Sequence, residues 1–163
     1  MATIEFTVYG KPEPRGSKQA FVPLHPKTKQ PYRRDNGGVV VSTVDDNKKS
    51  KGWMQSVASE ARDAYAGEPL GGPLRLSLTF HMPRPEYHFG TGRNAGVIKP
   101  RFANAAHTKK PDRLKLARAV EDAMTGIIYG DDSQTVAGPI DKRYCEPGTL
   151  PRVEITIEQL EDA

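Results

Sequence analysis

The chain has 163 residues, and its 24 lysines and arginines against 20 aspartates and glutamates give a net charge of +4. This length supports one hydrophobic core, so we expect residues 1–163 to form a single domain. The single cysteine, Cys145, excludes a disulfide framework and a cysteine-rich zinc site. Because no long apolar run or signal-peptide pattern occurs, we expect no membrane insertion or export, and a cytoplasmic location.

The first half of the chain predicts one strand and one helix. Ile4, Phe6 and Val8 alternate with polar residues and predict a half-buried strand that ends at Gly10. About thirty loop-like residues follow. Apolar residues then recur at helical spacing, which predicts a helix over 47–66 with a basic start.

The second half predicts three strands and a second helix. Strict alternation predicts a strand over 74–82, and a long loop of low periodicity is expected at about 84–108. Helical spacing returns at 114–124. An irregular strand over 134–144, with Pro139 at an edge or bulge, and an alternating strand over 153–157 complete the chain. The order β-α-β-α-β-β predicts a two-layer α+β domain with two helices on a mixed sheet.

Residues 107–136 carry the clearest chemical pattern, HTKKPDRLKLARAVEDAMTGIIYGDDSQTV. Asp112 stands where a helix begins, and Asp131 and Asp132 follow a short turn after it. Oxygen ligands of this type suit Mg²⁺ in phosphodiester-cleaving sites. Two simpler interpretations stay open at this point: Asp112 as a helix N-cap, and Asp131-Asp132 as part of a hairpin turn.

Basic residues gather in two runs, at the start of each predicted helix. Such runs are often solvated helix faces, but they also fit contacts to a nucleic-acid backbone. The candidate DNA-binding residues are Lys48, Lys49, Lys109, Lys110, Arg113 and Lys115.

The pattern resembles the RusA-type Holliday junction resolvases, whose members carry K-P-D-x-D-N-L-x-K-A-x-x-D-A-L, a turn and D-D-x-Q-V. The matching segments here are Lys110-Pro111-Asp112, Arg118-Ala119, Asp122-Ala123-Met124 and Asp131-Asp132-Ser133-Gln134. The resemblance implies the two-layer RusA-like fold, a homodimer, and a Mg²⁺ or Mn²⁺ cofactor held by Asp112, Asp131 and Asp132. It also implies that the chain is phage or prophage encoded and acts in the host cytoplasm.

The chain departs from the pattern at the second carboxylate, which falls on Leu114, and at the functional lysine, which falls on Arg118. At roughly 100° per residue, a core-facing stripe is formed by Leu116, Ala117, Val120, Ala123, Met124 and Ile127. Leu114 falls outside that stripe. Either a neighbour such as Glu121 or Asp122 assists the metal site, or the protein cleaves poorly. Asp122 is also spaced to pair with Arg118.

The resemblance therefore implies a Mg²⁺-dependent, structure-selective endodeoxyribonuclease that cleaves branched DNA such as four-way junctions. Its carboxylates would hold metal that activates a water, and Arg118 would neutralise the scissile phosphate. The alternative is a non-catalytic branched-DNA binding protein that has lost part of the metal site, which Leu114 favours.

Overall fold

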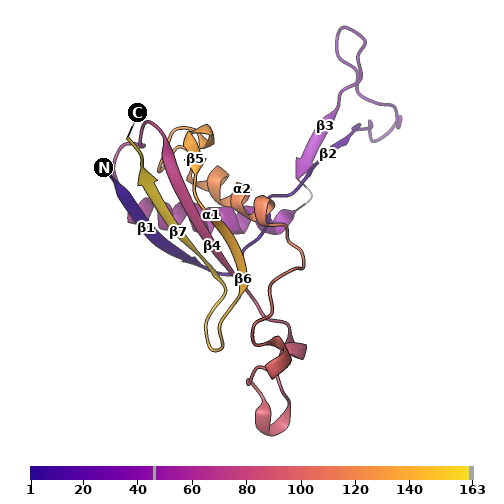
Figure 1. The fold of residues 1–163 in the computed structure, drawn as a ribbon. Helices are drawn as coiled ribbons and strands as arrows, with labels where there is room; N and C mark the ends of the chain where they lie inside the picture. Colours follow the sequence, from indigo (N-terminus) through magenta and orange to yellow (C-terminus); the bar gives the residue numbers. More distant parts are fainter. Residues whose placement is uncertain (46, 162–163) are drawn as a thin grey trace.

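A computed structural model describes residues 1–45 and 47–161, and its body is a mixed five-stranded sheet (Figure 1). The strands of this sheet are β1 (Thr3–Tyr9), β4 (Leu74–Met82), β5 (Thr135–Ala137), β6 (Ile140–Tyr144) and β7 (Arg152–Gln159). β7 lies between β1 and β4 and is antiparallel to both, whereas β5 and β6 pair in parallel with the other edge of β4. The strands predicted over 4–8, 74–82 and 153–157 are therefore confirmed.

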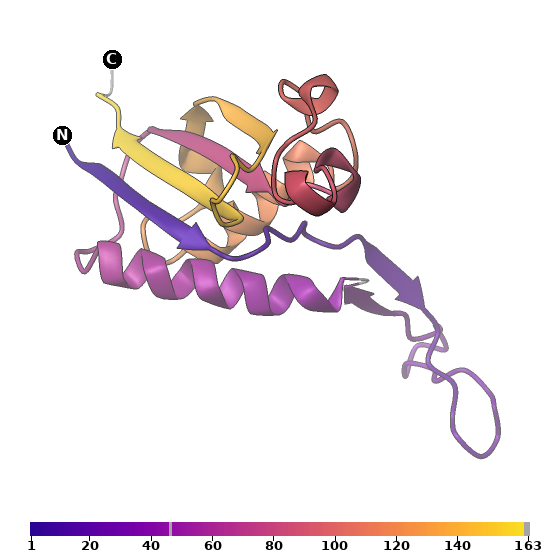
Figure 2. The ribbon, with the colours of Figure 1, turned by 90° about the horizontal axis from the view of Figure 1, so that it is seen from below.

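Two helices cover one face of the sheet, so the predicted two-layer α+β fold is confirmed (Figures 1 and 2). α1 (Lys48–Ala64) begins at Asn47, whose side chain accepts a hydrogen bond from the Lys49 N–H. It buries Trp53, Val57 and Ala61 against the sheet. α2 (Arg113–Met124) packs beside α1, and its buried residues join the same continuous core. Neither helix of the described chain is long and apolar enough to cross a membrane.

The edge next to β4 is broken, as the irregular pattern over 134–144 predicts. Gly138 has φ +127°, and a Cβ atom built there would lie 1.8 Å from the carbonyl oxygen of Leu76. Only glycine fits this close approach. The chain therefore changes course between β5 and β6, and the Leu78 N–H donates to the Pro139 carbonyl.

The prediction that the segment after the first strand is loop-like is wrong at two places. β2 (Lys18–Phe21) and β3 (Ser42–Asp45) pair antiparallel to form a separate two-stranded sheet. We call residues 18–45 the arm, because they project away from the body in both views (Figures 1 and 2). The pairing joins residues more than twenty positions apart, so no local periodicity in the sequence predicts it.

Residues 84–110, which we call the lobe, form a second projection (Figure 1). They contain three single 3₁₀ turns, η1 (Glu86–His88), η2 (Gly92–Asn94) and η3 (Pro100–Phe102). His88 is buried and stacks on Phe102 at a ring separation of 4.2 Å. Arg84 donates hydrogen bonds to the carbonyls of Phe102 and Cys145. The loop expected at 84–108 thus lacks long regular elements, but it has a packed aromatic centre of its own.

Candidate active site

Asp112 occupies the N-cap position of α2, but its side chain makes no capping hydrogen bond. The carboxylate is exposed and lies at a hollow of about 210 Å³. The other lining residues are Pro14, Lys110, Pro111 and Lys115. The simple N-cap interpretation of Asp112 is therefore wrong, and the carboxylate stands beside two lysines that can attract a phosphate.

Leu114 lies in the first turn of α2, and 65% of its surface is exposed. The predicted core stripe is buried, apart from the half-buried Ile127. The helical phase deduced from the sequence is therefore confirmed. Packing does not explain a leucine at this position.

Asp131 and Asp132 begin a 3₁₀ turn, η4 (Asp132–Gln134), directly after the buried Ile128 and Tyr129. The Asp131 carboxylate accepts a hydrogen bond of 2.8 Å from the Ser133 N–H. Hydrogen bonds from Ser133 hold the pKa of Asp131 below its usual value. Asp131 thus has a structural role as the cap of this turn, beside any role toward a metal.

The hydrogen bonds of Gln134 give a structural reason for the glutamine in the D-D-x-Q pattern. Its amide nitrogen donates to the carbonyls of Leu70 and Gly72, at 2.9 and 3.0 Å. Its amide oxygen accepts from the N–H groups of Gly130 and Asp131, at 2.9 and 3.0 Å. One side chain therefore fixes the two aspartates to the segment before β4, a role that sequence analysis missed.

Glu121 is the carboxylate that the fold brings toward Asp132. The Thr135 hydroxyl lies 3.0 Å from Glu121 Oε1 and 2.7 Å from the Asp132 carbonyl oxygen. Burial raises the pKa of Glu121, and the nearby charges of Asp132 and Asp122 raise it further, against the hydrogen bond from Thr135. Glu121 is therefore better placed than Asp112 to share a cation with Asp132 within one chain.

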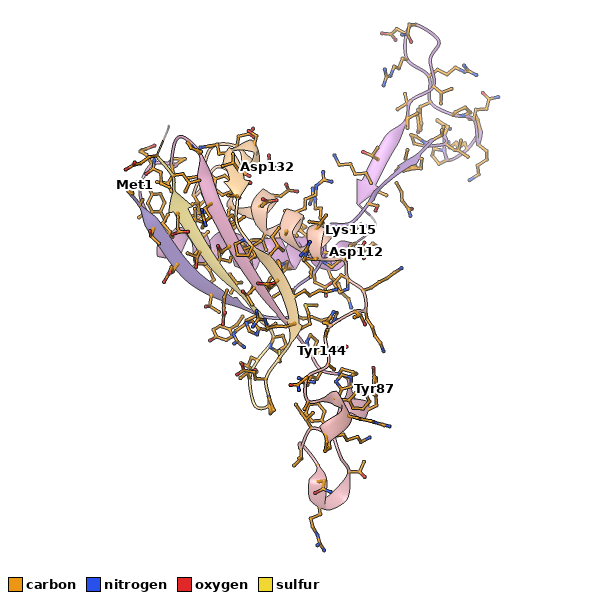
Figure 3. All side chains as sticks on the ribbon, in the orientation of Figure 1. Met1, Tyr87, Asp112, Lys115, Asp132 and Tyr144 are labelled. Atoms are coloured by element: carbon orange, nitrogen blue, oxygen red, sulfur yellow. The ribbon has the colours of Figure 1, made fainter. Side chains whose placement is uncertain are left out.

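Asp112 and Asp132 do not meet within one chain, because they flank opposite ends of α2 (Figure 3). Twelve helical residues span about 18 Å. Among the described residues, no group of three or more histidine, cysteine, aspartate or glutamate side chains is placed to hold a metal ion. The three predicted ligands therefore do not fit a single metal within one copy of the chain.

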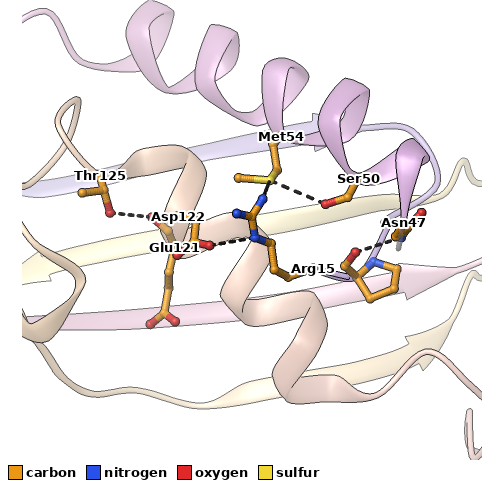
Figure 4. A network of polar contacts seen from close by, with 8 residues as sticks. Arg15, Asn47, Ser50, Met54, Glu121, Asp122 and Thr125 are labelled. Atoms are coloured by element: carbon orange, nitrogen blue, oxygen red, sulfur yellow. Dashed lines mark hydrogen bonds and ion pairs between the residues drawn. The ribbon is translucent and has the colours of Figure 1, made fainter. Parts of the chain in front are cut away.

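Asp122 has a different partner from the one expected (Figure 4). Its carboxylate lies 3.2 Å from Arg15 Nε, not against Arg118. The same guanidinium reaches the sulfur of Met54 in α1, at 3.2 Å. Arg15 therefore ties α1 to α2 ahead of the arm, and Arg118 stays exposed on the helix surface. The expected Arg118–Asp122 pair is a wrong prediction, because a residue distant in sequence occupies the carboxylate.

The predicted basic residues divide into two groups in the structure. Arg113 donates to the Ile140 carbonyl, and Lys109 Nζ lies 2.8 Å from the Tyr87 hydroxyl. This hydrogen bond is the main cause of the raised pKa of Lys109. Lys48 and Lys49 form the other group. They are exposed at the start of α1, where the sequence predicts a basic helix start.

A second hollow of about 300 Å³ adjoins the one at Asp112, and both share Lys110 and Pro111. Its cationic lining consists of Lys11, Arg84, Lys109 and Lys110, with His107 beside them and no carboxylate in the lining. Burial and the charges of Lys142 and Lys109 lower the pKa of His107. Sequence analysis did not include Lys11 or Arg84, because they lie far from the motif and meet it only in the fold.

Comparison with known families gives this arrangement a context. The family model Endodeoxyribonuclease RusA matches residues 23–158, which is most of the chain. The chain belongs to the RusA family. A similar protein from Bacillus subtilis (strain 168), described as uncharacterized protein YqaN, is 29% identical over 165 residues, covering 98% of this chain and 99% of that protein. The RusA match includes the arm from residue 23 onward, the lobe, and all of the carboxylates discussed above.

Proposed function

We propose that this RusA-family protein is a divalent-metal-dependent, structure-selective endodeoxyribonuclease that cuts branched DNA such as four-way junctions, with Mg²⁺ as the metal. The observation that carries the proposal is the exposed Asp112 carboxylate in a hollow between Lys110 and Lys115, next to a second hollow lined by four cationic side chains and no carboxylate. Lysines at such a site can neutralise a phosphate, while the carboxylate supplies a hard oxygen ligand. The family match over residues 23–158 supports the same activity.

We propose further that the protein works as a homodimer. The separation of Asp112 from Asp132 along α2 gives a physical reason for this, because one copy supplies only part of a metal-binding set at each end. A two-fold axis that sets the two α2 helices antiparallel brings Asp112 together with Asp132 of the partner subunit. It creates two equivalent sites, which suits a junction with two symmetric strands to cut.

Leu114 supports one rival function, a branched-DNA binding protein without nuclease activity. The side chain is exposed two residues after Asp112, where the family pattern has a carboxylate. A hydrocarbon cannot ligate a cation, so the site has fewer ligands than the pattern provides.

Labelled four-way junctions incubated with and without Mg²⁺ distinguish these functions. We expect paired, symmetric nicks that require the metal, and we expect Asp112→Asn and Asp132→Asn to abolish them while junction binding persists. Asp63→Asn, at an exposed position of α1 away from the motif, is the matched control and should cleave normally. Tight binding without nicks across Mg²⁺, Mn²⁺ and a range of pH would instead establish the rival.

A further inference from the structure

The arm exposes apolar side chains without contributing to the core. All four residues of β2 are exposed, and the two strands of the arm pair only with each other. A two-stranded ribbon is marginally stable by itself, and clustered apolar surface marks a contact region. The exposed apolar side chains of the arm are Phe21, Val22, Leu24, Tyr32, Val39, Val41 and Val44.

Charge separates the projections from the body. Residues 18–45 contain five lysines and arginines against two aspartates, a net charge of +3. Residues 84–110 contain six against one glutamate, a net charge of +5. Because the whole chain carries +4, the remaining residues sum to −4. The positive charge is therefore concentrated on the arm and the lobe.

Both projections are anchored beside the start of α2. The Lys115 carbonyl accepts from the Arg15 N–H at 2.9 Å, and Lys115 Nζ lies 3.3 Å from Ser17 Oγ, which anchors the root of the arm. Lys142 Nζ donates to the carbonyls of Lys109 and Pro111, both at 2.8 Å, which anchors the end of the lobe. The hollow at Asp112 lies between these two roots, and the projections diverge from it (Figures 1 and 3).

We propose that the arm binds the phosphate backbone of a DNA duplex that leads away from the phosphodiester at Asp112. This inference rests on the proposed function, since it identifies how the substrate of that site is held. Two cationic projections that diverge from one point repel each other, and a polyanion passing over that point neutralises both. A two-stranded β-ribbon also fits the major groove of B-DNA, where the exposed side chains of Phe21 and Tyr32 would contact thymine methyl groups.

The test is a binding measurement in EDTA, so that it does not depend on cleavage. The affinity for a four-way junction is measured against KCl concentration for the triple variant Lys27→Gln, Lys29→Gln, Arg34→Gln. The matched control is the triple variant Arg62→Gln, Arg75→Gln, Arg143→Gln, which removes the same charge from exposed positions of the body. Circular dichroism confirms that both variants fold, which the arm variant should do readily because it leaves the core intact.

We expect the arm variant to bind roughly tenfold more weakly at physiological salt, and its slope of log K against log salt to fall by up to about 2.7 units for three phosphate contacts. The control should bind within a factor of two of the wild type. Equal losses in both variants, or no loss in either, would overturn the role of the arm. Sedimentation gives a further check. If the wild type is a dimer and the arm variant is a monomer, the role of the arm in DNA binding is overturned, because the arm would then contact a second copy of the chain.

The two proposals fail in different ways. If the wild type nicks junctions and the arm variant binds them equally well, the arm proposal is wrong and the nuclease stands. If the arm variant loses affinity but the wild type nicks nothing with any metal, the arm proposal stands and the nuclease is wrong.

Discussion

Leu114 is the residue at which a single substitution tests the metal site, since its exposed side chain lies only two residues after Asp112, where the family pattern has a carboxylate. We expect Leu114→Asp to fold within about 0.5 kcal/mol of the wild type, because the position is on the surface and an acid in the first turn of a helix is favourable. We also expect it to raise Mg²⁺ affinity and junction cleavage. Urea unfolding and Mg²⁺ titration of the nicking rate measure the two effects.

Leu114→Asn is the control, as it has similar size and polarity but no charge. If the aspartate variant cleaves less than the asparagine variant, another carboxylate already occupies that coordination position and repels the new one. A large loss of stability in both variants would contradict the exposed position of Leu114.

Glu121 is a residue whose ionisation opposes folding. Burial and the neighbouring carboxylates of Asp132 and Asp122 raise its pKa, so the folded protein binds a proton there more readily than the unfolded chain does. Above the raised pKa the charged form costs stability, and this cost disappears as pH falls below the ordinary carboxyl range. We expect Glu121→Gln to be more stable than the wild type at pH 7 to 8, with an advantage that shrinks to nothing near pH 4.

Thermal unfolding of both proteins from pH 4 to pH 8 checks this prediction. Glutamine retains an amide oxygen that can accept from Thr135, so the comparison isolates the charge. A stabilisation that is constant across this range would contradict the electrostatic cause. In the same variant, lost Mg²⁺ binding would show that Glu121 shares the cation with Asp132.

At the scale of elements, the turn after α2 is held to the sheet by one side chain. Gln134 makes four hydrogen bonds, to Leu70, Gly72, Gly130 and Asp131. We expect Gln134→Ala to lower the free energy of unfolding by roughly 2 to 4 kcal/mol, at about 1 kcal/mol net for each lost bond less partial rescue by water. Denaturant unfolding measures the loss, and the exposed Gln55→Ala in α1 is the control. A change below 0.5 kcal/mol, the usual scale of surface substitutions, would contradict this structural role.

We expect the packing of the lobe to depend on pH through His88. Burial lowers the pKa of His88, and the positive charges of Arg84, Lys109 and Lys99 lower it further. A depressed histidine pKa means that the packing is fully stable above about pH 6.5 and weakens as pH falls through that value. We expect amide exchange in residues 84–110 to quicken below pH 6.5, after correction for intrinsic rates, while exchange in β4 and β7 does not.

His88→Phe should remove this pH dependence of exchange, because phenylalanine can stack on Phe102 without titrating. Equal pH dependence in that variant would rule out His88 as the cause.

At the scale of the whole molecule, the decisive question is whether one active site takes its carboxylates from one chain or two. We expect Asp112→Asn and Asp132→Asn proteins to be inactive alone and to regain activity when mixed and allowed to exchange. In an equal mixture half of the dimers are heterodimers, each with one intact site, so nicking should return to about a quarter of the wild-type rate.

Those heterodimers should produce single nicks without paired cuts, because their second site lacks both carboxylates. Gel analysis of singly and doubly cut junctions measures this ratio. If the mixture stays inactive although mass spectrometry shows heterodimers, each site uses both carboxylates of its own chain, and the two-chain arrangement is wrong.

The sequence by itself determined the two helices, the strands β1, β4 and β7 and the phase of α2, because these depend on local periodicity. The alternation of Leu74, Leu76 and Leu78 defines β4, and the helical period places Leu114 outside the core stripe, as its exposure confirms. The resemblance to the RusA pattern likewise rests on local segments such as Lys110-Pro111-Asp112, which lie within the matched residues 23–158. Each of these conclusions uses residues within a few positions of one another.

Only the tertiary structure decided which side chains meet. Arg15 displaces Arg118 as the partner of Asp122, Gln134 reaches back to Leu70, and the pairing of β2 with β3 makes an arm from a segment without periodicity. These contacts join residues far apart in sequence, and their geometry depends on the path of the whole chain. The twelve residues of α2, which span about 18 Å, likewise separate Asp112 at the start of the helix from Asp132 beyond its end, so the two carboxylates of one sequence motif do not meet in one chain.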